Sequence, residues 1–344
     1  MPKRPAAFAA HISLPFLLLI ALAAPSVPQT TAPSTERPRK VFPKEQEPED
    51  VVRIDTDLVS LDVTAFDAEG RPVRNLRQED FKIFSDGVEQ PISFFQLEKR
   101  PGEPRPLAIV FALDVSGSVT ADEMERLRLA LRSFSNQLSN HPVSYAVVTF
   151  GMRVKTVQKF TSDPDKLEDS IDRINRDPSN GLSTHTYDAV DDAIRMLVRN
   201  APRTRDRRLM KRTVLVVTDG FPVGDTVSPK TVIERANAAD VSVFVVTLPS
   251  YSRVIASSAQ TPLPTPLDVS GLAELTGGRN VYANEKDYAP LFRALAEEVS
   301  SAYVLAFYPP EEKRRDGKIH TIRVEGPRGL MLRQSRTEYR AADK

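Results

Sequence analysis

Five oxygen-bearing side chains, gathered in three loops next to apolar runs or a predicted helix, are the strongest candidates for chemistry in this sequence. They are Asp114, Ser116, Ser118, Thr184 and Asp219. The first loop has the spacing D-x-S-x-S (DVSGS), the second carboxylate follows the run TVLVVT, and the threonine lies in GLSTHTYDAV. Two carboxylates and three hydroxyls make an all-oxygen ligand set, which suits a hard divalent cation such as Mg²⁺ or Mn²⁺.

The spacing of the first loop favours a shared direction for its polar side chains. Alternate positions put one carboxylate and two hydroxyls on the same side of a tight turn, and Gly117 lets the backbone bend there. In an open α/β sheet, ligands bind at the carboxyl ends of strands near the point where strand order reverses. The alternative is that these residues only cap helices and turns, because Asp and Ser are ordinary turn formers.

Alternating strand and helix patterns surround these loops. The run 107–113 (LAIVFAL) is uninterrupted and apolar, which is typical of a strand covered on both faces. A capping box, Thr120 to Glu123, then begins a stretch with apolar residues at helical spacing. The same order recurs, with strands expected at 143–150, 213–218 and 241–248 and helices at 165–175, 187–198 and 231–239. We therefore expect an α/β fold, a doubly wound and mostly parallel sheet, over about 106–300.

Antiparallel β patterns flank this core on both sides. Short alternating runs fill 51–100, where the pair Asp86-Gly87 lies between two apolar-rich segments and predicts a hairpin. Alternating runs return in 301–340. We expect the two flanks to pair into one sheet or sandwich, into which the α/β core is inserted.

The N-terminal sequence has the pattern of a targeting segment. Two positive charges precede an apolar stretch of about twelve residues that ends in small residues (ALAAPS), the order of a secretory signal peptide. Such a stretch is short of the roughly 20 residues that span a bilayer, so we expect cleavage near Ala23, with a retained membrane anchor as the alternative. Residues 1–24 are then the signal peptide and 25–50 a disordered, Pro-rich tether. The mature protein is expected to be exported, to a periplasmic or extracellular location, without an integral membrane span.

The composition of the chain excludes several classes of partner and of metal site. With 344 residues the chain has room for about two domains of roughly 150 residues. Lys and Arg number 47 against 46 Asp and Glu, so net charge gives no sign of a nucleic-acid partner. The absence of cysteine excludes disulfides, thiolate nucleophiles and Cys-based zinc sites, and only four histidines are present. Any metal is therefore expected to be held by oxygen.

The residues of the three loops resemble a known metal site. DVSGSV, a later Thr-bearing loop and VVTDG are similar to the metal-ion-dependent adhesion site (MIDAS) of von Willebrand factor type A domains, and all five motif positions are matched. The likeness covers about 106–300. The flanking segments VRNLRQEDFKIFSDGVEQPISFF and YVLAFYPP resemble a bacterial subfamily of type A-related proteins common in acidobacteria.

The resemblance implies a Rossmann-like fold and a binding function rather than catalysis. It implies Mg²⁺, Mn²⁺ or Ca²⁺ on Asp114, Ser116, Ser118, Thr184 and Asp219, with one coordination position open to a Glu or Asp carboxylate of a protein ligand. His185 departs from the family pattern. It either tunes ligand preference when protonated, or is solvated or hydrogen-bonded to a nearby loop.

Three other interpretations remain open from the sequence. A hydrolase would use Ser116 or Ser118 as nucleophile and His185 as base, but no G-x-S-x-G elbow is present. The flanking β unit is a second possible recognition surface, and EDTA separates it from metal-dependent binding. A basic cluster precedes one core strand and is read as a solvated loop rather than an anion site. It consists of Arg203, Arg205, Arg207, Arg208, Lys211 and Arg212.

Overall fold

The structure is a computed structural model that describes residues 58–97, 104–175, 177, 184–205, 208–250, 264–283, 286–300 and 303–341. The chain divides into two compact units, Met1–Val51 and Val52–Lys344, and every described residue belongs to the second. The predicted signal peptide and tether lie outside the described residues. Residues 251–263 lie outside the described residues as well.

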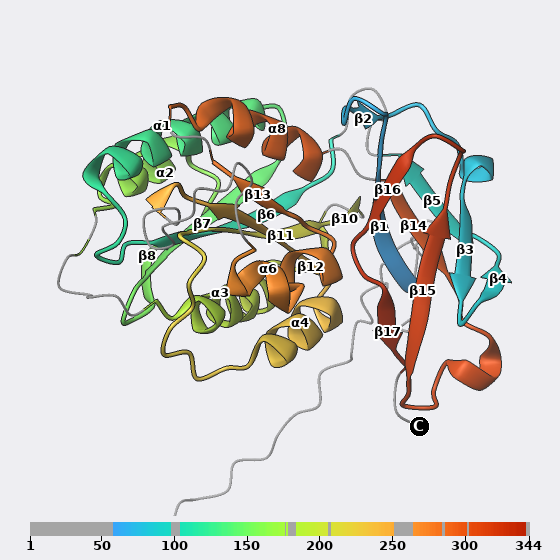
Figure 1. The fold of residues 1–344 in the computed structure, drawn as a ribbon. Helices are drawn as coiled ribbons and strands as arrows, with labels where there is room; N and C mark the ends of the chain where they lie inside the picture. Colours follow the sequence, from blue (N-terminus) through green and yellow to red (C-terminus); the bar gives the residue numbers. More distant parts are fainter. Residues whose placement is uncertain are drawn as a thin grey trace, which may run out of the picture. The chain divides into compact units, whose positions relative to one another are not determined.

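A six-stranded sheet forms the centre of the described chain (Figure 1). Its strands, in spatial order, are β13 (Asn280–Tyr282), β12 (Val241–Thr247), β11 (Lys211–Thr218), β6 (Leu107–Asp114), β7 (Val143–Phe150) and β8 (Lys155–Thr161). All neighbours pair in parallel except β7 and β8, which are antiparallel. The chain leaves β6 for β7 on one side and later places β11 on the other. Strand order therefore reverses between β6 and β11, and the α/β, mostly parallel fold class is confirmed.

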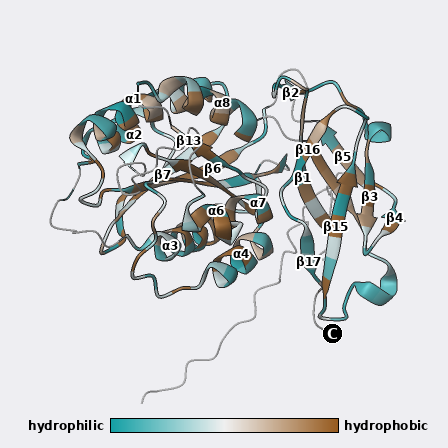
Figure 2. Cartoon of the chain, viewed as in Figure 1, coloured by the Kyte–Doolittle hydropathy of each residue, from teal (hydrophilic) through white to brown (hydrophobic). Residues whose placement is uncertain are grey.

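Helices cover both faces of this sheet (Figure 1). On one face lie α1 (Ala121–Gln137), α2 (Pro164–Asp172) and α8 (Ala289–Val299), which share a hydrophobic cluster. On the other lie α3 (Thr186–Asn200), α4 (Pro229–Ala238), α6 (Pro266–Ser270) and α7 (Leu272–Leu275). Figure 2 shows the central strands as largely hydrophobic and the helices around them as mixtures of hydrophilic and hydrophobic residues.

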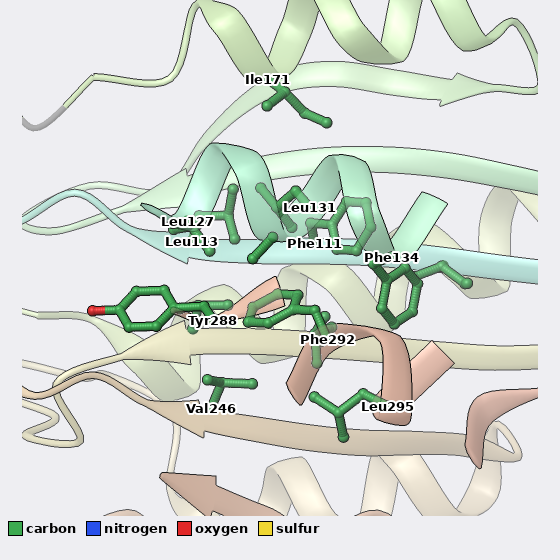
Figure 3. Close-up of a cluster of buried hydrophobic side chains, with 14 of the residues drawn as sticks. Phe111, Leu113, Leu127, Leu131, Phe134, Ile171, Val246, Tyr288, Phe292 and Leu295 are labelled. Atoms are coloured by element: carbon green, nitrogen blue, oxygen red, sulfur yellow. The ribbon is translucent and has the colours of Figure 1, made fainter. Parts of the chain in front are cut away.

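The side chains of strand β6 contribute to the hydrophobic clusters on both faces of the sheet. Every residue from Leu107 to Asp114 is buried. Because side chains alternate, its large residues enter the cluster with α1 and α8, whereas two alanines and a valine face α3. In the first cluster the Phe111 ring meets Phe134 edge-on at 5.5 Å (Figure 3). It also stacks on Tyr145 at 5.6 Å. These contacts fix β6 rigidly, and with it the loop that follows.

The two flanks pair with each other in two antiparallel sheets. One contains β1 (Val59–Phe66), β2 (Pro72–Val73), β5 (Phe94–Leu97), β14 (Tyr303–Phe307) and β16 (Met331–Gln334). The other contains β3 (Lys82–Ser85), β4 (Val88–Gln90), β15 (Ile319–Glu325) and β17 (Glu338–Arg340). Each sheet combines strands from before and after the α/β core, and a third hydrophobic cluster joins both sheets. Short elements complete the fold: η1 (Gln78–Asp80), η3 (Glu311–Lys313), β9 (Thr204–Arg205) and β10 (Arg208–Leu209).

The predicted hairpin is present between β3 and β4. Asp86 and Gly87 both have positive φ, 48° and 79°, which is the backbone twist that a two-residue turn needs. Asp86 also accepts hydrogen bonds from Thr321 N at 2.9 Å and from His320 at 2.8 Å. The turn therefore fixes the first flank to the second.

His320 is buried between two carboxylates. Its Nδ1 meets Asp86 and its Nε2 meets Asp316 at 3.0 Å, while its ring stacks on Tyr339. Burial lowers the pKa of His320, but the hydrogen bonds and charges of Asp316 and Asp86 outweigh burial and raise it above its ordinary value.

A buried ion-pair group links β1 to the central sheet. Asp62 lies 2.7 Å from the Arg105 guanidinium and 3.7 Å from the Lys211 ammonium, and both cationic side chains are almost fully buried. Burial alone would raise the pKa of Asp62, but Arg105 and Lys211 hold it below its usual range. The three charges therefore depend on one another.

The prediction that the basic cluster is a solvated loop is wrong for two of its residues. Lys211 and Arg212 lie in β11 and are buried, not solvated. The Arg212 guanidinium donates to the carbonyl oxygens of Ala239 at 3.0 Å and Ala201 at 2.6 Å. Strand burial and internal acceptors, which the sequence does not display, remove both cations from the surface. Arg207 lies outside the described residues.

Among the described residues, no helix combines the length and the apolar character needed to cross a bilayer.

Candidate metal-ion site

Four loops meet at the carboxyl edge of the central sheet, and backbone hydrogen bonds connect them. They are the loops after β6, β7 and β11 and the segment before α3. The bonds run from Val115 N to Phe150 O (2.9 Å), from His185 N to Gly151 O (3.0 Å), and in both directions between Thr184 and Val223 (3.1 and 2.9 Å). These loops therefore keep a fixed spacing at the position where strand order reverses.

Asp114 lies at the end of β6 and is fully buried. Its Oδ1 accepts from Ser116 N at 2.8 Å, and its Oδ2 accepts from the Thr218 hydroxyl at 2.7 Å. The Ser116 and Ser118 hydroxyl oxygens lie 2.9 Å apart. The first loop thus folds its carboxylate and both hydroxyls together, as the D-x-S-x-S spacing predicts.

Asp219 follows β11 and is also buried. It accepts from Phe221 N at 3.3 Å and from the Ser118 side chain. The next residue must be glycine: Gly220 has φ +87°, and an added Cβ would lie 2.6 Å from Thr265 Cγ2. This close contact accounts for the pair Asp-Gly at the end of the strand.

Side-chain contacts therefore connect four of the five predicted ligands: Asp114, Ser116, Ser118 and Asp219. Thr184 is buried, and the structure brings it to the same edge through its backbone pairing with Val223. The described contacts include none between the Thr184 side chain and the other four.

Electrostatics make this pair of carboxylates unusual. Burial, and secondly the charge of Asp219, raise the pKa of Asp114 from 3.8 to about 7. Burial also raises the pKa of Asp219, to which the Glu123 charge adds. In the described part of the chain, neither carboxylate forms an ion pair with a basic side chain. Two buried acids beside two hydroxyls favour a nearby positive charge, so these donors fit a hard divalent cation.

A cluster of three or more His, Asp or Glu side chains able to hold a metal is not found among the described residues. The predicted set contains only two carboxylates, and its remaining donors are hydroxyls. Any metal here would therefore depend on Ser and Thr oxygens and on water.

Three residues that support the candidate ligands are not predicted from the sequence. Thr218 is predicted only as part of a strand, although its hydroxyl donates to Asp114. Glu123 is predicted only as a helix cap; it does accept from Thr120 N at 2.8 Å, but its other oxygen accepts from Ser250 N at 2.7 Å, 127 positions along the chain. The capping box is the only signal that points to Glu123. The third is Asp188.

Asp188 lies in the first turn of α3 and holds the loop after Asp219. Its carboxylate accepts from Thr226 N and Oγ1, both at 3.0 Å, and from Val227 N at 2.9 Å. It also meets His185 Nδ1 at 3.0 Å. Burial raises the pKa of Asp188, but these hydrogen bonds outweigh burial and lower it overall. Asp188 thereby fixes the segment that carries Thr184 against the loop that follows Asp219.

These contacts also locate His185. Its ring bonds to Asp188 on one side, and Nε2 lies 3.0 Å from where a Cβ on Gly224 would be. The His185 ring therefore bonds to the first turn of its own helix and lies against the loop at Gly224. A hydrogen bond from His185 to Ser116 or Ser118, as a serine hydrolase would need, is not among the contacts of the described residues.

The fold and the site together define a class of proteins. A doubly wound sheet with a D-x-S-x-S loop after its first strand and an Asp-Gly loop after β11 is the arrangement of type A domains. A profile of the von Willebrand factor type A domain family matches residues 108–262. The chain therefore contains a von Willebrand factor type A domain. Such domains are often protein-interaction modules, are generally not enzymes, and commonly bind a divalent metal.

Solved structures give further likenesses. BatB from Bacteroides thetaiotaomicron is 18% identical over 56% of this chain and 97% of that chain, with a TM-score of 0.40. Proximal thread matrix protein 1 from the mussel byssus, solved with a zinc-occupied MIDAS motif, is 14% identical over 59% of this chain and 47% of that chain, with a TM-score of 0.43. The SpRpn10 VWA domain is 12% identical over 54% and 92%, with a TM-score of 0.39. A search of curated proteins found no match.

Proposed function

We propose that this protein is a metal-dependent binding module that contacts a protein ligand through a divalent cation at the carboxyl edge of its central sheet. The observation that carries the proposal is the buried pair Asp114 and Asp219, joined through Ser116 and Ser118 where strand order reverses. Thr184 completes the proposed ligand set.

Each residue has a distinct part in this proposal. A bound Mg²⁺, Mn²⁺ or Ca²⁺ supplies an electrophilic centre for a Glu or Asp carboxylate of the partner. Asp114 and Asp219 supply negative charge, and the hydroxyls of Ser116 and Ser118 supply neutral donors. Because only two protein ligands are charged, a partner carboxylate still adds favourable charge to the site. Thr218 and Asp188 hold the donors in place.

Isothermal titration calorimetry with Mg²⁺ and Mn²⁺ tests the metal site. Wild type is expected to bind, and Asp219→Asn is expected not to. Asp165→Asn is the matched control, because it removes an exposed carboxylate from another helix of the same domain. Absence of divalent binding by wild type, at millimolar metal and with acetate or a Glu peptide present, contradicts the proposal.

The proposed partner is tested by pull-down from the native exported fraction, once with Mg²⁺ and once with EDTA. We expect a partner that EDTA releases and that Asp114→Ala fails to retain. Binding that survives chelation would instead place recognition on the flanking β sheets.

Export of the protein is part of the same proposal, based on the apolar segment and small residues of 1–24. N-terminal sequencing of the native protein should find a mature chain that starts near Ala24. Retention of Met1 would contradict cleavage.

A further inference from the structure

Two large apolar side chains are exposed at the candidate metal edge. Met152 is 51% exposed and Val223 is 50% exposed. Singly exposed apolar residues are common on protein surfaces and need no explanation. These two differ by their position, because backbone hydrogen bonds place them on either side of the segment that carries Thr184.

Backbone contacts establish that position. Gly151, directly before Met152, accepts from His185 N at 3.0 Å. Val223 pairs with Thr184 through two hydrogen bonds of 3.1 and 2.9 Å. Met152 and Val223 therefore flank the segment that carries Thr184 from two different loops.

The two positions also differ in stiffness. Val223 is β-branched and held by two backbone bonds, and its loop is fixed further on by Asp188. Met152 is unbranched, and such side chains adapt to different apolar shapes. Together they offer one rigid and one adjustable apolar contact. Both lie on loops that hydrogen bonds already hold in place, so binding a partner requires little further ordering of these loops.

Charge at the same edge favours an acidic partner. Arg153 and Lys155 follow Met152, and both are exposed. A divalent cation would balance the charges of Asp114 and Asp219, which would leave Arg153 and Lys155 as positive charges beside the apolar surface. An acidic segment with apolar side chains next to the acid matches both features.

We propose that the partner presents a Glu or Asp flanked by aliphatic residues, and that Met152 and Val223 select it by contacting those aliphatic side chains. This inference rests on the proposed metal-dependent function and adds the sequence character of the ligand. Partial burial of the flanking aliphatic side chains should together raise affinity about five- to tenfold over polar neighbours.

Two synthetic peptides of equal length and charge provide the test, acetyl-Gly-Gly-Leu-Glu-Leu-Gly-Gly-amide and acetyl-Gly-Gly-Ser-Glu-Ser-Gly-Gly-amide. Each is titrated into the full chain with Mg²⁺ and followed by chemical-shift changes in the protein's amide spectrum. Wild type should bind the Leu peptide about five- to tenfold more tightly. The double variant Met152→Ser, Val223→Ser should lose this preference while it keeps its affinity for the Ser peptide.

Val198→Ser is the matched control. Val198 is 53% exposed but lies on α3, outside the loops that border Thr184. This variant should keep the wild-type preference for the Leu peptide. The inference is wrong if wild type shows no preference, if neither peptide binds, or if the double variant keeps the preference.

The outcomes separate this inference from the function on which it rests. If calorimetry shows Mg²⁺ binding but the peptides bind equally or not at all, the apolar selection fails and the metal site stands. If no divalent ion binds, or if EDTA leaves peptide binding unchanged, the proposed function itself fails.

Discussion

Replacing Asp219 by asparagine should make the metal-free protein more stable while it abolishes metal binding. The substitution keeps the shape of the side chain and an oxygen that can accept from Phe221 N and Ser118. It removes the charge that opposes ionisation of Asp114, and that charge is itself unfavourable where Asp219 is buried. A residue whose sole duty was to cap a turn would not gain stability on neutralisation.

The size of the gain follows from the electrostatics of the pair. The pKa of Asp114 rises from 3.8 to about 7. At about 1.4 kcal/mol per pH unit, ionising Asp114 in the fold costs about 4 kcal/mol more than ionising it in the unfolded chain. Burial is the larger cause and the charge of Asp219 the second. Neutralising Asp219 should therefore recover less than half of this, about 1–2 kcal/mol, or about 2 to 5 °C in melting temperature.

The sign of the pH dependence provides an internal check. A carboxyl whose pKa is raised by folding loses stability as pH rises, here from about 4 to about 7, because the unfolded chain ionises first. The advantage of Asp219→Asn should thus be full at pH 8 and should shrink toward pH 5. Differential scanning calorimetry in EDTA measures it. A variant less stable than wild type at pH 8, or one that still melts higher with Mg²⁺, would refute the reasoning.

Two further predictions concern the flanking sheets. Asp62→Ala should leave Arg105 and Lys211 buried without their carboxylate and lower the free energy of unfolding by about 3–5 kcal/mol in urea titrations. Asp67→Ala removes a carboxylate from an exposed ion pair and should cost far less, so equal losses would contradict this interpretation. His320→Gln should be less stable than wild type below pH 6.5, and the difference should disappear as pH rises through the raised pKa of His320, which chemical denaturation at several pH values can follow.

Much of the fold was predictable because the core strands are buried on both faces. The run LAIVFAL at 107–113 is short, uninterrupted and apolar, which is typical of a strand buried on both faces. The hairpin at Asp86-Gly87 was predictable because few residue pairs adopt positive φ twice. The antiparallel edge strand β8 was missed, since its partly exposed pattern lacks both signals.

Contacts between distant residues set the limit of sequence reasoning at the site. The residues of the D-x-S-x-S loop are near neighbours in the chain, so their convergence follows from local spacing. Asp188 meets Thr226, 38 positions away, and Glu123 meets Ser250, 127 positions away. No local pattern marks such pairs, because only the packing of α1 and α3 on the sheet brings them together. The burial of Lys211 depends in the same way on β1.

The arrangement of the site follows from a conflict between stability and binding. Two carboxylates buried at the ends of adjacent strands oppose folding, and the apolar contacts of β6 with α1 and α8 must offset that cost. Hydrogen bonds from Thr218 and Ser118 satisfy carboxylate oxygens without neutralising them. The negative charge of the two carboxylates therefore remains unbalanced inside the fold unless a positive ligand binds there. A ligand that neutralises this charge would stabilise the fold in proportion to its affinity, so binding and stability should be linked at this one edge of the sheet.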